Sequence, residues 1–83
     1  MLEKMPLNNS EELIIKIGAK IQELRESKGL KNYEKFAIAN DMSRSHYWNI
    51  EKGKVNLTIK TLSKILDALD VKVEDFFKEL NEG

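Results

Sequence analysis

Apolar residues recur at helical spacing along nearly the whole chain of 83 residues. Positions three and four residues apart share one face of an α-helix, whereas a half-buried strand alternates with a period of two. Three stripes have the helical spacing: Ile14, Ile17, Ile21 and Leu24; Leu62, Ile65, Leu66 and Leu69; and Val73, Phe76, Phe77 and Leu80. The pattern predicts an all-α protein whose last helix lies near residues 73–80.

Residues typical of helix ends divide this pattern into five helices. Asn9 begins the first helix, and Glu11 and Glu12 lie in its first turn, where carboxylates favour the helix dipole. The second helix lies within residues 32–40. The expected N-caps of the next three helices are Asn32, Ser43 and Thr58. Gly29 is expected to end the first helix as a left-handed C-cap, and Gly53 is expected to end the third helix.

A chain of this length forms a single domain, because its core is too small to support long loops or a second unit. We therefore expect a compact five-helix bundle. Residues 1–8 precede the first helix and are expected to form a flexible N-terminal arm. Residues 71–83 are expected to form a C-terminal helix that completes the bundle.

The composition argues against several kinds of chemistry. The chain contains no Cys, which excludes disulfides and thiolate zinc sites. The single histidine, His46, has no second imidazole or thiolate with which to share a metal, and we expect it to be a partly packed side chain. Nothing places a Ser, His and Asp together, and no glycine-rich phosphate loop is present. We expect no enzyme, no metal, no cofactor and no small-molecule ligand.

Two features of the sequence bear on location. No apolar run approaches the length needed to cross a bilayer, and residues 1–6 lack the apolar stretch of a signal peptide. We therefore expect a cytoplasmic protein with no membrane contact.

The charged residues are distributed unevenly, although the formal net charge is zero. Residues 28–60 carry seven Lys and Arg against three Asp and Glu. Residues 61–83 carry three against six. The middle of the chain is therefore its positive pole, whereas the zero net charge of the whole chain by itself argues against a strongly nucleic-acid-binding surface. The alternative is ordinary scatter of charges over a solvated surface.

The predicted third helix separates two kinds of side chain. At about 100° per residue, the core side receives His46, Tyr47 and Ile50. The opposite side receives Arg44, Ser45, Trp48, Asn49 and Lys52. Such groups can read base edges or bind phosphate. Because only a few residues join it to the second helix, the third helix can project into a DNA groove about 12 Å wide.

Six segments of the chain form a recognisable set: Ile17–Arg25, Lys28–Leu30, Phe36–Ala37, Met42–Ser45, Ile50–Gly53 and Thr61–Leu69. Together they resemble the helix-turn-helix family of the lambda-repressor and Cro type, also called the XRE family, over residues 14–77. The resemblance implies a lambda-repressor-like bundle in which residues 9–70 form the DNA-binding domain and the helix near residues 44–51 enters the major groove. The implied function is sequence-specific binding of double-stranded DNA by a small transcriptional regulator that acts as a repressor.

The resemblance also implies roles for single residues. The implied base contacts are Arg44, Ser45 and Asn49, with Trp48 on the same face. The implied backbone contacts are Asn32, Tyr33, Lys52, Lys54 and Asn56. Arg25 and Glu51 match positions that form an ion pair between the first and third helices.

The residues themselves leave alternatives open at each of these positions. Arg44 could contact guanine, or it could bind phosphate or remain solvated. Ser45 and Asn49 could contact bases or hydrogen-bond to their neighbours. The ring of Trp48 could meet a thymine methyl, a sugar or a protein partner, or it could be half-buried against the second helix.

The chain departs from the family pattern around the second helix. A Gln common at the start of that helix is missing, and Lys31–Ala37 is one residue longer than usual. The glycine that normally opens the following turn is replaced by Asp41, which follows Asn40. One of these two residues is expected to adopt the left-handed conformation, which both types tolerate.

The C-terminal stripe suggests contact with a second copy of the chain. One of its two phenylalanines should cap the bundle, and the surplus, the other aromatic together with Leu80, is expected to stay exposed. Phe76, Phe77 and Leu80 are therefore the candidate dimer contacts. A homodimer would place two recognition helices about 34 Å apart on a palindromic operator. The alternative is a protein-interaction module, such as an antitoxin or a partner subunit, anchored by Trp48 and this stripe.

Overall fold

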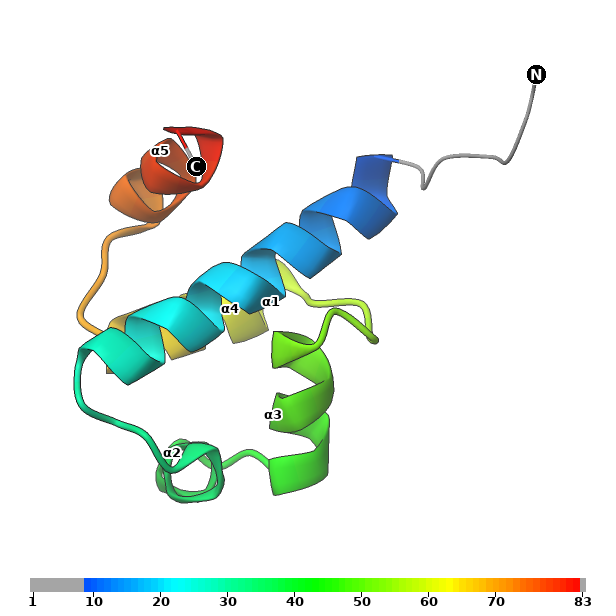
Figure 1. Ribbon diagram of the computed structural model, residues 1–83. Coiled ribbons are helices and arrows are strands. Elements are labelled where there is room, and N and C mark those ends of the chain that lie inside the picture. Colours follow the sequence, from blue (N-terminus) through cyan, green and yellow to red (C-terminus); the bar gives the residue numbers. More distant parts are fainter. Residues whose placement is uncertain (1–8, 83) are drawn as a thin grey trace.

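The computed structural model describes residues 9–82, and this part of the chain contains five helices and no strand. The helices are α1 (Asn9–Ser27), α2 (Tyr33–Ala39), α3 (Arg44–Glu51), α4 (Ile59–Ala68) and α5 (Val73–Glu82). The long α1 runs through the middle of the molecule, with α2 and α3 on one side and α5 on the other (Figure 1). The all-α, five-helix prediction is confirmed. The predicted arm, residues 1–8, lies outside the described residues.

Side-chain caps begin three of the helices where the sequence predicted them. The side chains of Asn32, Ser43 and Thr58 each accept a hydrogen bond from the backbone N–H three residues later, at 3.0, 3.1 and 3.0 Å. These bonds satisfy N–H groups that have no partner within the helix. Because such caps depend on a few neighbouring residues, the sequence was enough to place them.

Left-handed residues end the helices or open the turns after them. Gly29 has a φ of +81°, as predicted, and Gly53, which was predicted only to end α3, is also left-handed with a φ of +69°. In the turn between α2 and α3, Asp41 takes the left-handed conformation with φ of +59°. Its neighbour Asn40 instead donates a side-chain hydrogen bond of 2.7 Å to the carbonyl of Phe36.

The core is built from one face of each helix. Its fully buried members with less than 2% exposure include Ile21, Tyr47, Ile65, Leu66, Leu69 and Phe76. Phe76 is 0% exposed within one protomer, so it is the phenylalanine that caps the bundle, as expected of one of the two, and it is not the one available for a dimer contact. Burying an aromatic ring in so small a core stabilises the fold more than exposing it would. Phe77 and Leu80 pack against this core but remain partly exposed.

Helices α1 and α3 touch through their backbones at Gly18. A Cβ atom at Gly18 would collide with the carbonyl oxygen of Ile50 and lie 2.7 Å from that of Glu51. At Gly53, just after α3, a Cβ would lie 2.8 Å from the Cα of Ile15. Any side chain at either position would therefore push the end of α3 away from α1. Gly18 lies within the segment Ile17–Arg25 that carries the family resemblance, but the sequence pattern gave it no role.

A buried ion pair joins the same two helices. Arg25 Nε and Nη2 donate to the two carboxylate oxygens of Glu51 at 2.7 and 3.1 Å, which is the pair that the family resemblance implied. Arg25 Nη1 also donates to the carbonyl of Leu30 at 2.7 Å. The hydrogen bond to Glu51 raises the pKa of Arg25, although burial opposes this shift. One guanidinium therefore connects α1, the end of α3 and the loop that leads to α2.

Replacing Gly18 with Ala should destabilise the protein by about 1–3 kcal/mol, because the added methyl group collides with backbone that cannot move out of the way. The gain in helix propensity, about 1 kcal/mol, offsets only part of this cost. Urea unfolding measures the change. Gly29→Ala separates crowding from backbone strain, because nothing lies within 4 Å of the added methyl and its cost comes from the left-handed φ of +81° alone. A Gly18→Ala variant as stable as the wild type would contradict the close contact.

Removing one partner of the buried ion pair should cost about 3–5 kcal/mol, because the other charge is left without compensation. Glu51→Gln and Arg25→Met each test this by thermal and urea unfolding. The double variant Arg25→Met/Glu51→Met should lose much less than the sum of the two single losses, because it buries no charge. Losses that simply add would show that the two side chains act independently.

Candidate nucleic-acid interface

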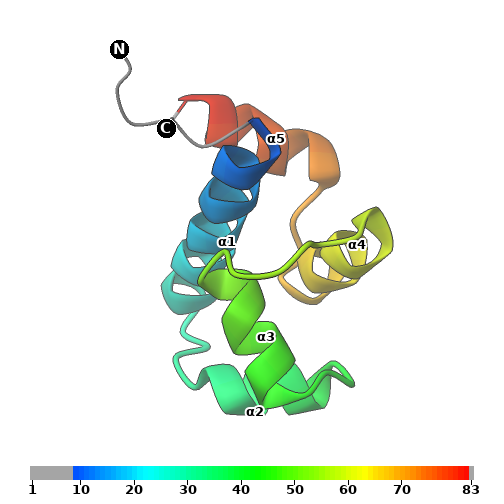
Figure 2. The ribbon, with the colours of Figure 1, turned by 90° about the vertical axis from the view of Figure 1, so that its right-hand side faces the viewer.

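Helices α2 and α3 form a tight two-helix unit. Their connection is held by backbone hydrogen bonds from Asn40 and Met42 to the carbonyl of Ala37, at 3.0 and 2.9 Å. The rings of Phe36 and Tyr47 pack together across the unit, with centroids 5.3 Å apart. In Figure 2, α3 lies on the face toward the viewer, α2 crosses near its lower end, and no other helix passes in front. The unit thus presents one side of α3 to the solvent.

The solvent side of α3 carries the polar groups that the sequence placed there. Arg44, Ser45 and Lys52 are exposed, and Trp48 and Asn49 are half-buried. Tyr47, Ile50 and Glu51 form the buried side. None of the proposed DNA-contacting residues of α3 is fully buried, so a duplex could reach all of them.

His46 lies differently from the prediction. It was expected to be partly packed on the core side, but it is exposed. On the helical wheel it falls beside, and not within, the arc of Tyr47, Ile50 and Glu51, so the bundle does not cover it. The error came from treating every residue off the polar side as a core residue.

Arg44 has an acidic neighbour that the sequence analysis did not identify. Its Nη1 lies 3.3 Å from Oε2 of Glu34, which is in the first turn of α2, and the two side chains are 68% and 44% exposed. The two residues are ten positions apart, and only the angle between α2 and α3 brings them together. No spacing rule within a single helix would have indicated this pair.

Two lysine side chains lie beside the ring of Trp48. The Nζ atoms of Lys52 and Lys54 lie 5.7 and 5.1 Å from the ring centroid, within the range of cation–π attraction. Lys52 Nζ also donates to Gln22 Oε1 at 3.3 Å. Trp48 is half-buried, and this exposure fits each of the alternatives left open by the sequence. The result is a compact positive cluster at the C-terminal end of α3.

The other candidate backbone contacts flank α3 on both sides. Asn32 uses its side-chain oxygen as the cap of α2, which leaves its amide N–H groups free to donate. Tyr33, the first residue of α2, is half-buried against the core. Lys54 and Asn56 are exposed in the loop between α3 and α4. These residues lie at the start of α2 and after α3, where they could hold a duplex in place.

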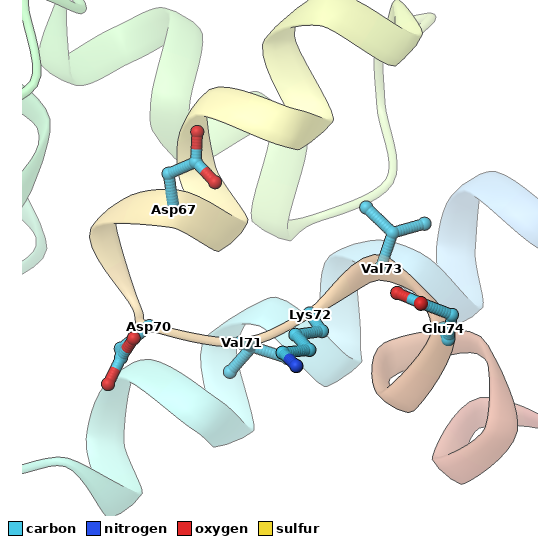
Figure 3. Close-up of a pocket in the computed structure, with 6 residues that line it drawn as sticks. All are labelled: Asp67, Asp70, Val71, Lys72, Val73 and Glu74. Atoms are coloured by element: carbon cyan, nitrogen blue, oxygen red, sulfur yellow. The ribbon is translucent and has the colours of Figure 1, made fainter.

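A different kind of surface lies at the turn between α4 and α5. There a hollow of about 270 Å³ is lined by Asp67, Asp70, Val71, Lys72, Val73 and Glu74 (Figure 3). Three carboxylates there would repel phosphate. Over residues 9–82, no group of three His, Cys, Asp or Glu is placed to hold a metal ion. None of the helices described is long and apolar enough to span a membrane.

Comparison with known sequences places the chain among regulators. A helix-turn-helix family model matches residues 21–76. Control protein C.MunI of Mycoplasma sp is 32% identical over 68 residues, which cover 82% of this chain and 92% of that protein. Control protein C.BamHI of Bacillus amyloliquefaciens is 34% identical over 70% of this chain and 72% of its own. Plasmid copy control protein CopR of Streptococcus agalactiae is 47% identical, but over only 54% of this chain and 49% of its own.

Solved structures give the same result. A variant of the restriction-modification controller protein C.Esp1396I superposes with a TM-score of 0.77 and 32% identity, covering 86% of this chain and 93% of that one. The controller protein C.AhdI from Aeromonas hydrophila gives a TM-score of 0.75 with 28% identity, over 84% of this chain and all of its own. With the exposed polar side of α3, these similarities show that the chain belongs to the XRE-type helix-turn-helix family of small DNA-binding transcription regulators.

Proposed function

We propose that this regulator binds a palindromic operator as a homodimer in the cytoplasm and represses transcription there. The observation that carries the proposal is the open polar side of α3, where Arg44 and Ser45 are exposed and no other helix covers them. The alternative of a protein-interaction module is not favoured, because the relatives are control and controller proteins.

The pattern of similarity favours restriction-modification control as the regulatory task. The two solved controllers of this kind are covered over 93% and 100% of their chains. The plasmid copy control protein is covered over about half of its length. Similarity over the whole fold includes the surfaces that would join the protomers and set the distance between the two half-sites. The full-length similarity to the controllers is therefore a better guide to function than the partial similarity to the copy control protein.

The proposed contacts are of two kinds: contacts with bases, which recognise the sequence, and contacts with the DNA backbone, which position the protein. Arg44 would donate two hydrogen bonds to a guanine, and Ser45 and Asn49 would contact neighbouring bases, with the Trp48 ring against a thymine methyl or a sugar. Phosphates would be bound by Asn32, Tyr33, Lys52, Lys54 and Asn56. The lysines held beside Trp48 are already gathered before DNA binds, so less side-chain freedom is lost on binding.

The proposed dimer uses the outer side of α5. Phe77 and Leu80 are partly exposed there, and Val73 is 45% exposed on the same helix. An isologous contact through α5 would relate the α3 helices of the two protomers by a two-fold axis. This arrangement fits a palindrome with half-sites about one helical turn apart.

Arg44→Ala and Lys54→Ala should affect DNA binding in different ways. A duplex selected in vitro and a random duplex of the same length are titrated with each variant. Arg44→Ala should weaken binding to the selected duplex by about 5–150-fold, the equivalent of 1–3 kcal/mol, and leave random binding nearly unchanged. Lys54→Ala should weaken both alike and reduce the salt dependence, because a phosphate contact is lost. Equal losses for Arg44→Ala on both duplexes would contradict base reading.

Leu80→Glu should dissociate the dimer, because it places a charge in an apolar contact between protomers. Sedimentation should then show a monomer, and affinity for the selected palindrome should fall at least tenfold while a single half-site is bound as before. Circular dichroism checks that α5 is still folded. A wild-type protein that sediments as a monomer at concentrations that saturate the operator would contradict the proposed dimer.

A further inference from the structure

The pair between Glu34 and Arg44 puts a carboxylate on the surface that faces DNA. Arg44 Nη1 lies 3.3 Å from Glu34 Oε2, and both side chains are well exposed. An exposed pair of this kind contributes little to folding stability. A negative charge beside phosphates also opposes the binding of any duplex. Neither stability nor affinity therefore accounts for it.

The position of Arg44 adds a second observation. Arg44 is the first residue of α3, directly after the cap Ser43, where the helix dipole disfavours a cation. The first turn of α3 contains no acid of its own. Glu34, which comes from α2, supplies the compensating charge. The guanidinium is thus held by a neighbouring helix before DNA arrives.

The geometry leaves one edge of the guanidinium free. An arginine has five N–H donors in a planar fork, and Glu34 engages Nη1. The edge formed by Nε and Nη2 can still donate two parallel hydrogen bonds, which is what the O6 and N7 atoms of guanine accept. The same edge can also grip a phosphate, but a phosphate carries a full negative charge that the neighbouring Glu34 carboxylate repels, whereas guanine is neutral.

We propose that Glu34 is a specificity-determining residue that positions Arg44 for guanine and penalises its use as a phosphate contact. This inference rests on the proposed function, since it requires that Arg44 reads a base. It predicts that Glu34 lowers affinity for random DNA more than affinity for the operator. The gain from Glu34 is therefore in discrimination between sequences.

A simpler explanation is that Glu34 only complements the dipole of α2, as an acid in the first turn of a helix does. Glu74 provides the matched control. It is an exposed acid in the first turn of α5, in the hollow of Figure 3 and away from α3. Glu34→Gln and Glu74→Gln change the net charge equally and remove the same kind of dipole interaction.

The experiment compares the two variants on the selected duplex and on a random duplex of equal length, over a range of salt concentrations. For Glu34→Gln, the ratio of the two affinities should fall about tenfold, mainly because random binding tightens. For the random duplex, the slope of log affinity against log salt concentration should steepen by about one per protomer, because each freed Arg44 reaches a phosphate. Glu74→Gln should leave the ratio and the salt dependence unchanged.

A second comparison tests whether Glu34 acts through Arg44. In the Arg44→Ala background, Glu34→Gln should no longer change the ratio. A ratio that falls equally with and without Arg44, or that is unchanged in Glu34→Gln, would overturn the inference. A wild-type protein that does not distinguish the two duplexes would instead contradict the proposed function, so the two failures can be told apart.

Discussion

The close approach of α1 to the end of α3 is the contact on which the rest of the molecule depends. At Gly18 the two backbones meet with no space for a methyl group, and Arg25 and Glu51 form a buried pair beside this point. The backbone contact fixes the distance between the helices, and the bidentate pair fixes their rotation. Because the side chains proposed to read bases stand on α3, their placement follows from a contact on its opposite side.

The sequence predicted the local features of the fold well, because their causes are local. The caps at Asn32, Ser43 and Thr58 each bond to a backbone group three residues away, so the pattern of neighbouring residues was sufficient. Features that depend on how helices cross were not accessible. The collision that excludes a side chain at Gly18 became visible only with α1 and α3 in place, as did the pairing of Glu34 with Arg44.

The same limit explains the errors and the open questions in the candidate site. Helical spacing separated the polar side of α3 from its buried side, but it could not tell that Trp48 and Asn49 would be half-buried or that the bundle stops short of His46. Nor could it decide which aromatic residue of α5 fills the core, since Phe76 and Phe77 are adjacent and equally apolar. The choice depends on the rotation of α5 about its axis, which is set by packing and by the 3.1 Å ion pair between Lys20 and Glu79.

The third hydrogen bond of Arg25, to the carbonyl of Leu30, ties the approach to α2 to the same guanidinium that holds α3. The two helices that would lie against a duplex are therefore anchored to one rigid reference, and they cannot pivot separately. In the proposed dimer, any mismatch between operator length and protein must be absorbed elsewhere, by bending or twisting of the DNA or by movement at the joint between subunits. How well the dimer tolerates base pairs inserted at the centre of an operator then depends on the flexibility of the joint between subunits and on the elasticity of the DNA.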